Sequence, residues 1–378
     1  MMQAGFRKIV FLTGTRADFG KLKSLMHRLR DDIEFELHIF VTGMHMLSKY
    51  GYTCEEVEKE NFKNIYKFIN QNVNDSMDNI LAKTISGVSD FVKEIGPDLI
   101  VVHGDRVEAL AGAAVGALNN IPVGHIEGGE VSGTVDELLR HAVSKLSHVH
   151  FVANEVARNR LVQLGESSST VHVIGSPDVD VMNSNTLPRI QEVKKYYDFD
   201  FAEYSILMFH PITTEHADLH RQISTIVDQV VESGLNYIVI YPNNDIGTDI
   251  ILREYDKLAG FTRIRIYPSM RFEYFLTLLK NAKFIIGNSS AGIREAPHFG
   301  VPAIDLGTRQ NNRVQCRGVL NVKIEAAMIR QAIEDVKYMP RRAYTLFGNG
   351  GSDQRFVEIL KKSEFWNIKT QKYFVDRY

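Results

Sequence analysis

Hydrophobic and polar positions follow two different periods along the first half of the chain. Short apolar runs rich in β-branched residues are followed by longer segments with a helical repeat of about 3.6 residues. The runs predicted as strands are KIVFLTG, FELHIFVTG, DLIVVHG, IPVGHIEGG, HVHFVA and VHVIGSP, and helices are expected from Asp18, from Arg106, from Val135 and through Leu164. This alternation is typical of strand–helix–strand units that build a parallel sheet.

The second half repeats the pattern after a polar stretch, 183–204, which we predict to be a linker. Its predicted strands are YSILMFHP, NYIVIYPN, IRIYPS, KFIIGNSS, VPAIDLG and VLNV, with helices over 218–232 and 271–281 and another that ends at Ala259. Because single hydrophobic cores stop growing at roughly 250 to 300 residues, a chain of 378 residues suits two domains. The predicted fold class is therefore α/β, with two doubly wound, Rossmann-like domains.

A glycine-rich turn, GNGGS, precedes one more amphipathic helix, over 353–362. An aromatic tail follows it and contains Phe365, Trp366, Tyr373 and Phe374. The predicted divisions are an N-terminal domain over 1–182, a C-terminal domain over 183–351, and a terminal helix and tail over 352–378.

Composition narrows the possible partners and the compartment. The formal charge is -2 and no long basic run occurs, so a nucleic-acid partner is not expected. Cys54 and Cys316 are the two cysteines, which excludes a disulfide framework and a thiolate metal cluster. No stretch approaches the roughly 18 apolar residues of a membrane span, and the apolar run near the start is too short for a signal peptide. A cytoplasmic protein without a membrane partner is predicted.

The segment GTRADFGK lies between the first strand and its helix. Glycine lets the backbone approach an anion, the start of a helix presents N–H groups, and Arg16 and Lys21 add positive charge. A phosphate could bind there. Spacing alone supports equally well a helix capped by Asp18 with solvated cations nearby.

Two later strands end in HGDR and HIEGGE. If each strand continued two residues further, His103 would point the same way as Asp105, and His125 the same way as Glu127. Two carboxylates in one cleft suit proton removal and proton delivery at a substrate carbon. In the structural alternative, Asp105 caps the next helix and Glu127 borders a glycine turn. In a further alternative, the same four residues bind a metal ion.

The helix after these strands starts with Asp136 and Glu137, where the helix dipole favours acidic residues whatever their function. Taken alone, both are predicted to be structural. His141 and Lys145, four residues apart on one face of this helix, are minor candidates with a solvated role favoured.

The second half places further polar residues after its strands. The run GNSSAG ends a strand and is expected to open a helix, so hydroxyls and N–H groups would meet an anion there. A simple N-capped helix would explain one serine and not the glycines. Other candidates are His210, Asn243, Phe272, Arg309 and Arg313, for which half-buried, core or surface roles are the structural alternatives.

Taken in order, GTRADFGKL, HGDR, HIEGGE with SGTVDE, RHAVSKLSH, FHP with TTE, GNSSAGIREA and GTRQ with NR resemble the hydrolysing UDP-N-acetylglucosamine 2-epimerases. The match covers nearly the whole chain and looks like the branch of bacterial sialic acid biosynthesis. The resemblance implies the two-domain architecture of GT-B glycosyltransferases, substrate in the interdomain cleft, and a last helix that returns to the first domain. It also implies anti elimination of UDP to 2-acetamidoglucal, followed by syn addition of water to give N-acetylmannosamine, with no metal or redox cofactor.

Carried over by motif, Asp105, Glu127 and Asp136 are the expected acid–base carboxylates, and His210 would contact the diphosphate near the breaking bond. Phe272 would lie beside the uracil. The full set of expected substrate contacts is Arg16, Asp18, Lys21, Arg106, Asn243, Phe272, Ser289, Ser290, Gly292, Glu295, Arg309 and Arg313.

Several rival functions stay open at this point. A GT-B glycosyltransferase would bind the same donor, but transfer needs only one base, and a non-catalytic sensor would have no use for the three acids. Relatives of the family act on a UDP-2,4-diacetamido-trideoxy sugar or return UDP-N-acetylmannosamine without hydrolysis. The partner is expected to be a small UDP-sugar, and a homodimer or higher homo-oligomer is expected because C2 pairs are the commonest oligomers.

Overall fold

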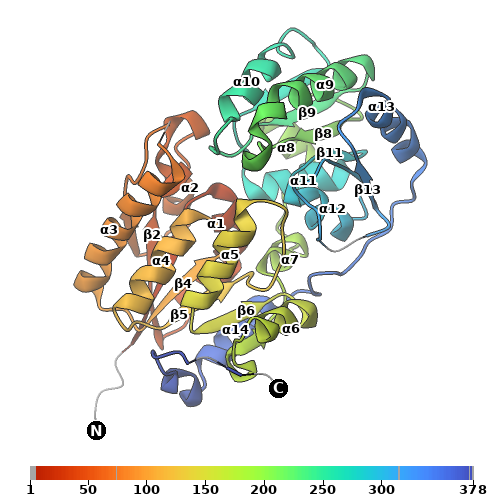
Figure 1. The fold of residues 1–378 in the computed structure, drawn as a ribbon. Coiled ribbons are helices and arrows are strands. Elements are labelled where there is room, and N and C mark those ends of the chain that lie inside the picture. Colours follow the sequence, from red (N-terminus) through yellow and green to blue (C-terminus); the bar gives the residue numbers. More distant parts are fainter. Residues whose placement is uncertain (1–5, 74, 314–315, 374, 377–378) are drawn as a thin grey trace. The chain divides into compact units, whose positions relative to one another are not determined.

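The structure is a computed structural model that describes residues 6–73, 75–313, 316–373 and 375–376 (Figure 1). The chain divides into two compact units. Unit 1 comprises the chain up to Glu130, Asp136–Asn183 and the chain from Phe347 onward, whereas unit 2 comprises Val131–Val135 and Ser184–Leu346. The segment Val131–Val135 contacts the rest of unit 2, where the N–H of Gly133 donates to the carbonyl of Arg309 at 2.9 Å.

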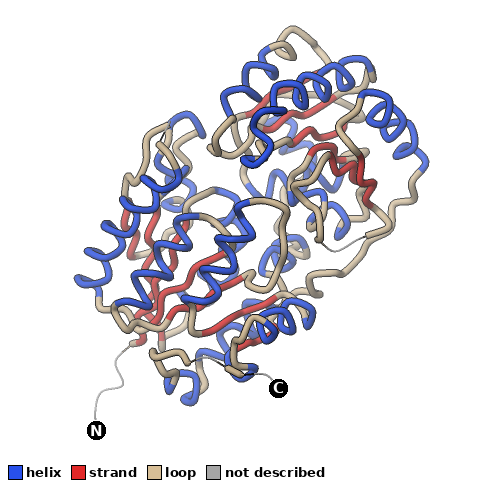
Figure 2. Tube along the Cα trace, viewed as in Figure 1, coloured by secondary structure: helices blue, strands red, loops and turns tan. Residues whose placement is uncertain are grey.

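Unit 1 is built on a parallel sheet whose strands are drawn in red in Figure 2. Its strand order is β3-β2-β1-β4-β5-β6-β7, so the order reverses at β1. The strands are β1 (Arg7–Thr13), β2 (Phe35–Val41), β3 (Asn64–Lys67), β4 (Leu99–His103), β5 (Val123–Ile126), β6 (Val149–Val152) and β7 (Val171–Val173). Because all are parallel, their carboxyl ends meet at one edge, and the point of reversal between β1 and β4 is where such sheets bind ligands.

Helices cover both faces of this sheet. One face packs on α1, α7 and α14, and the other on α3, α4 and α5, while α6 packs on β6 and β7. The helices are α1 (Arg16–Arg30), α2 (Cys54–Glu58), α3 (Met77–Ile95), α4 (Val107–Leu118), α5 (Val135–Leu146), α6 (Glu155–Gln163), α7 (Pro177–Met182) and α14 (Ser352–Leu360). A doubly wound unit follows from this two-sided burial.

The last helix, α14, belongs to the core of unit 1. The fully buried ring of Phe356 lies edge-on to Phe11 of β1 and Phe151 of β6, with ring centroids 6.2 Å and 4.7 Å away. The carboxylate of Asp180 accepts the backbone N–H groups of Ser352 and Asp353, both at 3.0 Å, and so caps the start of the helix.

Unit 2 repeats the architecture with a parallel sheet of order β10-β9-β8-β11-β12-β13, which reverses at β8. One face of this sheet packs on α9, α10 and α13 in a buried hydrophobic core. The strands are β8 (Ser205–Met208), β9 (Tyr237–Ile240), β10 (Ile264–Tyr267), β11 (Ile285–Gly287), β12 (Ala303–Leu306) and β13 (Val319–Val322). The helices are α8 (Ile190–Tyr196), α9 (Leu219–Glu232), α10 (Thr248–Asp256), α11 (Phe272–Asn281), α12 (Glu295–His298) and α13 (Ala326–Asp335).

The structure differs from the sequence-based expectation in several places, and helices α2, α7 and α13 are among the elements that were not predicted. The expected linker over 183–204 contains α8, which packs on α11 through the aromatic pair Tyr196 and Tyr274. Strand β3 and helix α3 were not predicted, although α3 is amphipathic and ends at a left-handed glycine, Gly96. The run GNSSAG opens a 3-10 turn, Ser290–Gly292, followed by only four residues of α-helix.

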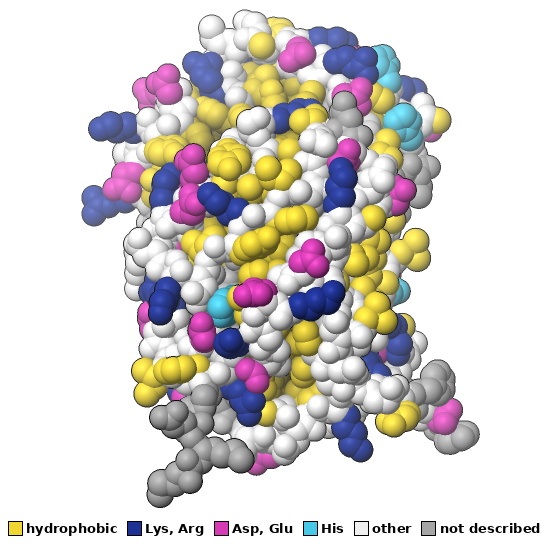
Figure 3. Space-filling model, turned by 90° about the vertical axis from the view of Figure 1, so that its left-hand side faces the viewer, with side chains coloured by type: hydrophobic (Ala, Val, Ile, Leu, Met, Phe, Trp, Pro, Cys, Tyr) yellow, Lys and Arg dark blue, Asp and Glu magenta, His cyan; other side chains and the backbone are white. Residues whose placement is uncertain are grey.

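Charged side chains of both signs are interspersed with hydrophobic ones on the face drawn in Figure 3. That face therefore presents neither a uniformly basic nor a uniformly acidic field. Across the described part of the chain, no helix combines the length and the apolar character that crossing a membrane would require.

Candidate active site

The loop after β1 is organised by the carboxylate of Asp18. It accepts the N–H groups of Gly14 and Thr15, both at 3.0 Å, and the hydroxyl of Thr13 at 2.7 Å. Thr15 accepts the N–H of Asp18 in return, which completes a capping box at the start of α1. Asp18 thus has the structural role that spacing allowed, and a substrate contact by it stays a prediction. Arg16 is the first residue of α1 and is partly exposed.

Beyond the carboxyl ends of β4 and β5, three side chains of unit 1 surround the carboxylate of Glu127. Its carboxylate lies 3.1 Å from the ring of His103, 3.7 Å from the guanidinium of Arg140 and 3.9 Å from the ammonium of Lys21. Arg140 also forms a close ion pair with Asp105. Two of the three predicted catalytic carboxylates, Asp105 and Glu127, therefore share one guanidinium, whose side chain is 0% exposed.

The reason for this convergence is not the strand alternation that the sequence suggested. Strand β4 ends at His103 and β5 at Ile126, and Gly104 and Glu127 both have left-handed backbone angles, with φ of 71°. Glu127 therefore turns away from the direction of His125 and reaches His103 of the neighbouring strand. Asp105 is not the helix cap, since Arg106 occupies that position before α4.

The alternative interpretation as a metal site requires the side chains of His103, Asp105, His125 and Glu127 to converge. The ring of His125 instead bonds to the carbonyl of Gly104 at 2.9 Å and to the hydroxyl of Ser144 at 3.1 Å, so neither of its nitrogens faces the other three groups. Among the residues that the structure describes, no group of three or more His, Cys, Asp or Glu side chains has an arrangement that could hold a metal ion.

Three further predicted residues of unit 1 lie beside this cluster. Lys21 is buried between Glu127 and Asp178, 3.7 Å from the latter, so its ammonium stands among carboxylates, and nucleotide contact by it stays a prediction. Asp136, in the first turn of α5, is close enough to influence Arg140. Arg106 pairs with buried Glu108 at 3.3 Å.

Sequence reasoning missed Arg140, which organises the carboxylates. Burial acts to lower the pKa of Arg140, but Asp105, Glu127 and other acids outweigh it and raise the pKa above its usual value. The residue stands in the motif RHAVSKLSH, four positions after Asp136, and this spacing puts both on one face of α5. That helical spacing is the signal that could have identified it.

The site in unit 2 is centred on His210, which follows β8. The N–H of Asn243 donates to Nδ1 of His210 at 3.1 Å, so a neutral ring carries its proton on Nε2. The fully buried side chain of Asn288 bonds both backbone groups of His210, at 2.7 Å to the N–H and 2.8 Å to the carbonyl. Asn288 was missed although it stands in the predicted GNSSAG run, because its amide acts on another strand.

The remaining residues of the GNSSAG run shape a tight turn. Ser289 caps the 3-10 turn by accepting the N–H of Ala291 at 3.3 Å, and Gly292 ends that turn. Ser290 is partly exposed, and Glu295, the first residue of α12, is buried. The run was expected to open a helix directly, but the α-helix begins only at Glu295, so the N–H groups beside the serines belong to a turn.

Arg309 and Arg313 lie close to the end of β12. Arg309 donates to the carbonyl of Asn288 at 3.3 Å. Burial raises the pKa of Asp305, on β12, to about 7, although Arg313 and Arg309 lower it. Asp305 was not predicted. Phe272 begins α11 and is 5% exposed, which is the core role named as its alternative, and base stacking by it stays a prediction.

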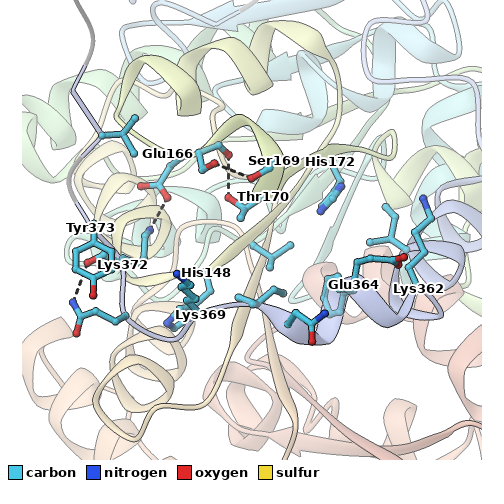
Figure 4. Close-up of a pocket in the computed structure, with 18 of the residues that line it drawn as sticks. His148, Glu166, Ser169, Thr170, His172, Lys362, Glu364, Lys369, Lys372 and Tyr373 are labelled. Atoms are coloured by element: carbon cyan, nitrogen blue, oxygen red, sulfur yellow. Dashed lines mark hydrogen bonds and ion pairs between the residues drawn. The ribbon is translucent and has the colours of Figure 1, made fainter.

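A cavity of about 590 Å³ lies elsewhere in unit 1 and is drawn in Figure 4. Its lining includes His148 before β6 and Thr170 before β7, so it lies toward the amino ends of these strands. Lys372 of the C-terminal tail points toward Glu166 there, at 2.6 Å. The candidate catalytic residues follow the opposite ends of their strands, and the cavity is therefore a separate feature.

Comparison with known proteins agrees with this geometry. Residues 27–361 match the protein family described as UDP-N-acetylglucosamine 2-epimerase. The chain is 50% identical over 375 residues to the UDP-N-acetylglucosamine 2-epimerase of Neisseria meningitidis serogroup B, with 98% of this chain and 99% of that protein covered. It is 33% identical to the UDP-N,N'-diacetylbacillosamine 2-epimerase (hydrolyzing) of Legionella pneumophila, with 94% and 96% covered.

A solved structure confirms the predicted fold class. The crystal structure of Methanocaldococcus jannaschii UDP-GlcNAc 2-epimerase in complex with UDP-GlcNAc and UDP matches with a TM-score of 0.78 at 25% identity, and the match covers 93% of this chain and 99% of that chain. Two doubly wound α/β units of the GT-B type are thus shown by the strand orders and by this likeness. By sequence and by fold, the chain belongs to the UDP-N-acetylglucosamine 2-epimerase family.

Proposed function

We propose that this chain is a hydrolysing UDP-N-acetylglucosamine 2-epimerase, which converts its substrate and water into UDP and N-acetylmannosamine. The observation that carries the proposal is the carboxylate pair Asp105 and Glu127 around the buried guanidinium of Arg140, in a member of this family. A fixed positive charge favours the ionised carboxylates, and ionised carboxylates can accept a proton or stabilise a positively charged sugar ring.

The proposed reaction has two steps. In the first, a carboxylate removes the proton on carbon 2 while the bond from carbon 1 to the UDP oxygen breaks, which leaves 2-acetamidoglucal. In the second, water adds its hydroxyl to carbon 1 and a proton reaches carbon 2 with inverted configuration. Because the carbon 2 proton is poorly acidic, departure of UDP runs ahead and leaves positive charge on the ring. Asp105, Glu127 and Asp136 are the groups that we assign to these proton transfers and to stabilising that charge.

We assign recognition of UDP mainly to unit 2. His210 presents an Nε2–H donor in its neutral form, as its contact with Asn243 requires, and the turn at Ser289 and Ser290 supplies hydroxyls near Arg309. Preorganised donors of this kind commonly contribute about 3 to 4 kcal/mol each to the stabilisation of departing charge. The other residues assigned to substrate binding are Arg16, Asp18, Lys21, Arg106, Asn243, Phe272, Gly292, Glu295 and Arg313.

A second substrate has a specific observation in its favour. The Legionella relative carries the name of a hydrolysing 2-epimerase for UDP-N,N'-diacetylbacillosamine, a UDP-2,4-diacetamido-trideoxy sugar. Its name also supports hydrolysis in this chain. Identity to it is 33%, against 50% to the Neisseria UDP-N-acetylglucosamine 2-epimerase, and this difference favours UDP-N-acetylglucosamine as the substrate.

Proton NMR in heavy water tests the proposal. With UDP-N-acetylglucosamine we expect free UDP and N-acetylmannosamine that carries deuterium at carbon 2. UDP-N-acetylmannosamine as the product would indicate the non-hydrolysing reaction, and UDP release only with an added acceptor would indicate a glycosyltransferase. Binding without turnover would indicate a sensor. Faster turnover of the diacetamido substrate would favour the second candidate, and loss of turnover with a chelator would support the metal alternative.

We further propose the biological setting that the motifs imply. The product N-acetylmannosamine makes this reaction the first step of sialic acid biosynthesis, in the cytoplasm. We also propose a homodimer or higher homo-oligomer, since C2 pairs are the commonest oligomers. Light scattering coupled to size exclusion measures the mass directly, and a monomer would contradict this part of the proposal.

A further inference from the structure

The imidazole of His125, on β5, is fully buried and bonded at both nitrogens. Nε2 lies 2.9 Å from the carbonyl oxygen of Gly104, and Nδ1 lies 3.1 Å from the hydroxyl oxygen of Ser144. A carbonyl can only accept, so Nε2 carries a proton, and in the neutral ring Nδ1 accepts from the Ser144 hydroxyl. Burial, aided by His150, lowers the pKa of His125 to about 3, which keeps this ring neutral at physiological pH.

The Gly104 carbonyl belongs to the peptide bond that leads into Asp105. A peptide group is planar, so a hydrogen bond that fixes its oxygen also fixes the plane from which the Asp105 backbone starts. Gly104 has a φ of 71° and lacks a side chain that could hold this plane by packing. Its N–H donates to the carbonyl of Ile126 at 2.9 Å. Strand β5 therefore holds both peptide groups that flank Gly104, one of them through His125.

The same ring also supports the residue after Glu127. A Cβ atom on Gly128 would lie 3.0 Å from Nδ1 of His125 and 3.2 Å from the hydroxyl of Ser144. The backbone of Gly128 thus packs directly against the ring and its partner. Ser144 in turn follows Arg140 by four residues on α5, so both lie on one face of that helix.

We propose that His125 is a positioning residue for the carboxylate pair. Its Nε2–H holds the peptide plane before Asp105, its ring supports the backbone after Glu127, and its contact with Ser144 ties both to the helix that carries Arg140. This inference rests on the proposed function, because it assigns a purpose to the placement of Asp105 and Glu127. His125 touches no substrate in this scheme and transfers no proton.

Substitution of His125 by leucine or glutamine tests the role. In His125→Leu we expect kcat to fall about 100-fold, as a displacement of about 1 Å at reacting groups commonly does, with little change in KM or in the affinity for UDP. The amide nitrogen of glutamine can occupy the place of Nε2 and donate to Gly104. His125→Gln should therefore recover most of the lost turnover, although it alters the packing.

His150→Leu is the matched control. His150 lies beside His125 on β6, is equally buried, and pairs with Glu166 at 3.0 Å, away from the carboxylates. It should lower the unfolding temperature as His125→Leu does, yet leave kcat close to that of the wild type. An unchanged kcat in His125→Leu, an equal loss in His150→Leu, or no recovery in His125→Gln would each overturn the inference.

Two further measurements keep the proposal testable if His125→Leu does not fold or if the reaction itself proves different. Ser144→Ala removes one hydroxyl and retains the ring, and a fall in kcat of roughly fivefold is expected from the loss of one hydrogen bond. Nitrogen-15 shifts of the His125 ring should show a protonated Nε2 and a bare Nδ1. The opposite tautomer would refute the positioning role, whereas a wild type that releases no UDP would refute only the proposed function.

Discussion

Arg140 sets the electrostatic state of the carboxylates around it. Its guanidinium is fully buried, contacts Asp105 and Glu127, and keeps its charge because the surrounding acids raise its pKa against the effect of burial. A guanidinium does not give up its proton in proteins, so it is a permanent counter-charge. Asp105, the closer of the two acids, therefore faces a fixed positive charge, which suits a base or a stabiliser of positive charge on the sugar.

Asp105→Asn tests this assignment at the level of one residue. The amide keeps the size of the side chain but cannot take up a proton, and we expect kcat to fall by about 100-fold to 10,000-fold, the usual range for general acid–base groups. UDP affinity, measured by calorimetry, should change little because unit 2 carries the assigned nucleotide contacts.

Asp98→Asn is the control for that substitution. Asp98 precedes the same strand, β4, and binds Arg7 at the opposite end of it. Its replacement should affect stability and not turnover. If Asp105→Asn lost UDP affinity in proportion to turnover, Asp105 would be a binding residue and the acid–base role would be wrong.

At the level of elements, the two sites form where the strand order of each sheet reverses. In unit 2 the side chain of Asn288, just after β11, bonds both backbone groups of His210 beyond the neighbouring strand β8. The ends of β11 and β8 can approach each other closely there because Gly287 has no side chain. A Cβ atom on Gly287 would lie 1.9 Å from the carbonyl oxygen of Met208. Two strand ends are thus joined by one amide.

Asn288→Ala breaks this connection. It leaves the buried N–H and carbonyl of His210 without their partner, and we expect the free energy of unfolding to fall by about 2 to 3 kcal/mol. UDP should bind more weakly because His210 loses its fixed place. Urea denaturation and calorimetry measure the two effects. Asn281→Ala, which removes a single bond to Thr277 at the end of α11, should change stability by less than about 1 kcal/mol.

An Asn288→Ala variant that bound UDP with normal affinity would contradict the assigned role of His210. A loss of stability without a loss of UDP affinity would also contradict it, because the bonds between Asn288 and His210 would then stabilise the fold without contributing to UDP binding.

Most elements of the fold could be predicted from the chain because their periods are strong. The strand Leu99–His103 and the helix Leu219–Glu232 show their apolar runs and amphipathic faces directly in the sequence. Strand β3 has only four residues, partly exposed, and pairs along one edge, so its pattern is weak. Helix α8 stands in a polar stretch and depends on contacts with α11, which sequence spacing does not reveal.

The candidate site was predictable only in its residue types. Polar residues after parallel strands must gather at one edge, and on that ground Asp105 and Glu127 were placed together. Their shared position around Arg140 depends on left-handed backbone angles at Gly104 and Glu127 and on the placement of Arg140 on α5. Neither angle nor partner follows from strand alternation. The same holds for Asn288, whose side-chain amide bonds the backbone of His210, about 80 residues away in sequence. Sequence spacing does not show which distant segments are brought together.

At the level of the whole molecule, the C-terminal tail is fixed to unit 1 by a buried charge cluster. Burial would raise the pKa of Glu166, but His150, Lys372 and Lys145 outweigh it and lower the pKa to about 2. Burial also lowers the pKa of Lys372, and the hydrogen bond to Glu166 offsets this effect only in part. Lys372 donates in addition to the carbonyls of Lys145 and Ser147, at 2.9 Å and 2.6 Å, near the end of α5.

In Glu166→Gln we expect the free energy of unfolding to depend less on pH in the acidic range. The folded pKa of about 2 lies below the ordinary 4.5, so the charge of Glu166 stabilises the protein above pH 4.5, and this contribution is lost as the pH falls toward 2. The shift corresponds to about 3 kcal/mol at neutral pH. We expect the variant to be less stable by roughly this amount at pH 7, with a difference that shrinks below pH 4.5.

Urea denaturation at a series of pH values measures the effect. Glu364→Gln, an exposed glutamate at the cavity of Figure 4, is the control and should unfold like the wild type at each pH. A deficit for Glu166→Gln that stayed constant from pH 7 to pH 3 would contradict the linkage, since it would not follow the ionisation of Glu166.

The return of the chain to unit 1 also implies an order in which the two units fold during translation. Domains commonly fold as units during synthesis, the earlier one first. Here Phe356, which fills the space between Phe11 and Phe151, is made only after unit 2 has been translated in full. Unit 2, which ends at Leu346, can therefore fold before unit 1, whose core is incomplete until α14 has been made. A message cut short by a few dozen codons would yield a nascent product with a complete unit 2 beside an unfinished unit 1.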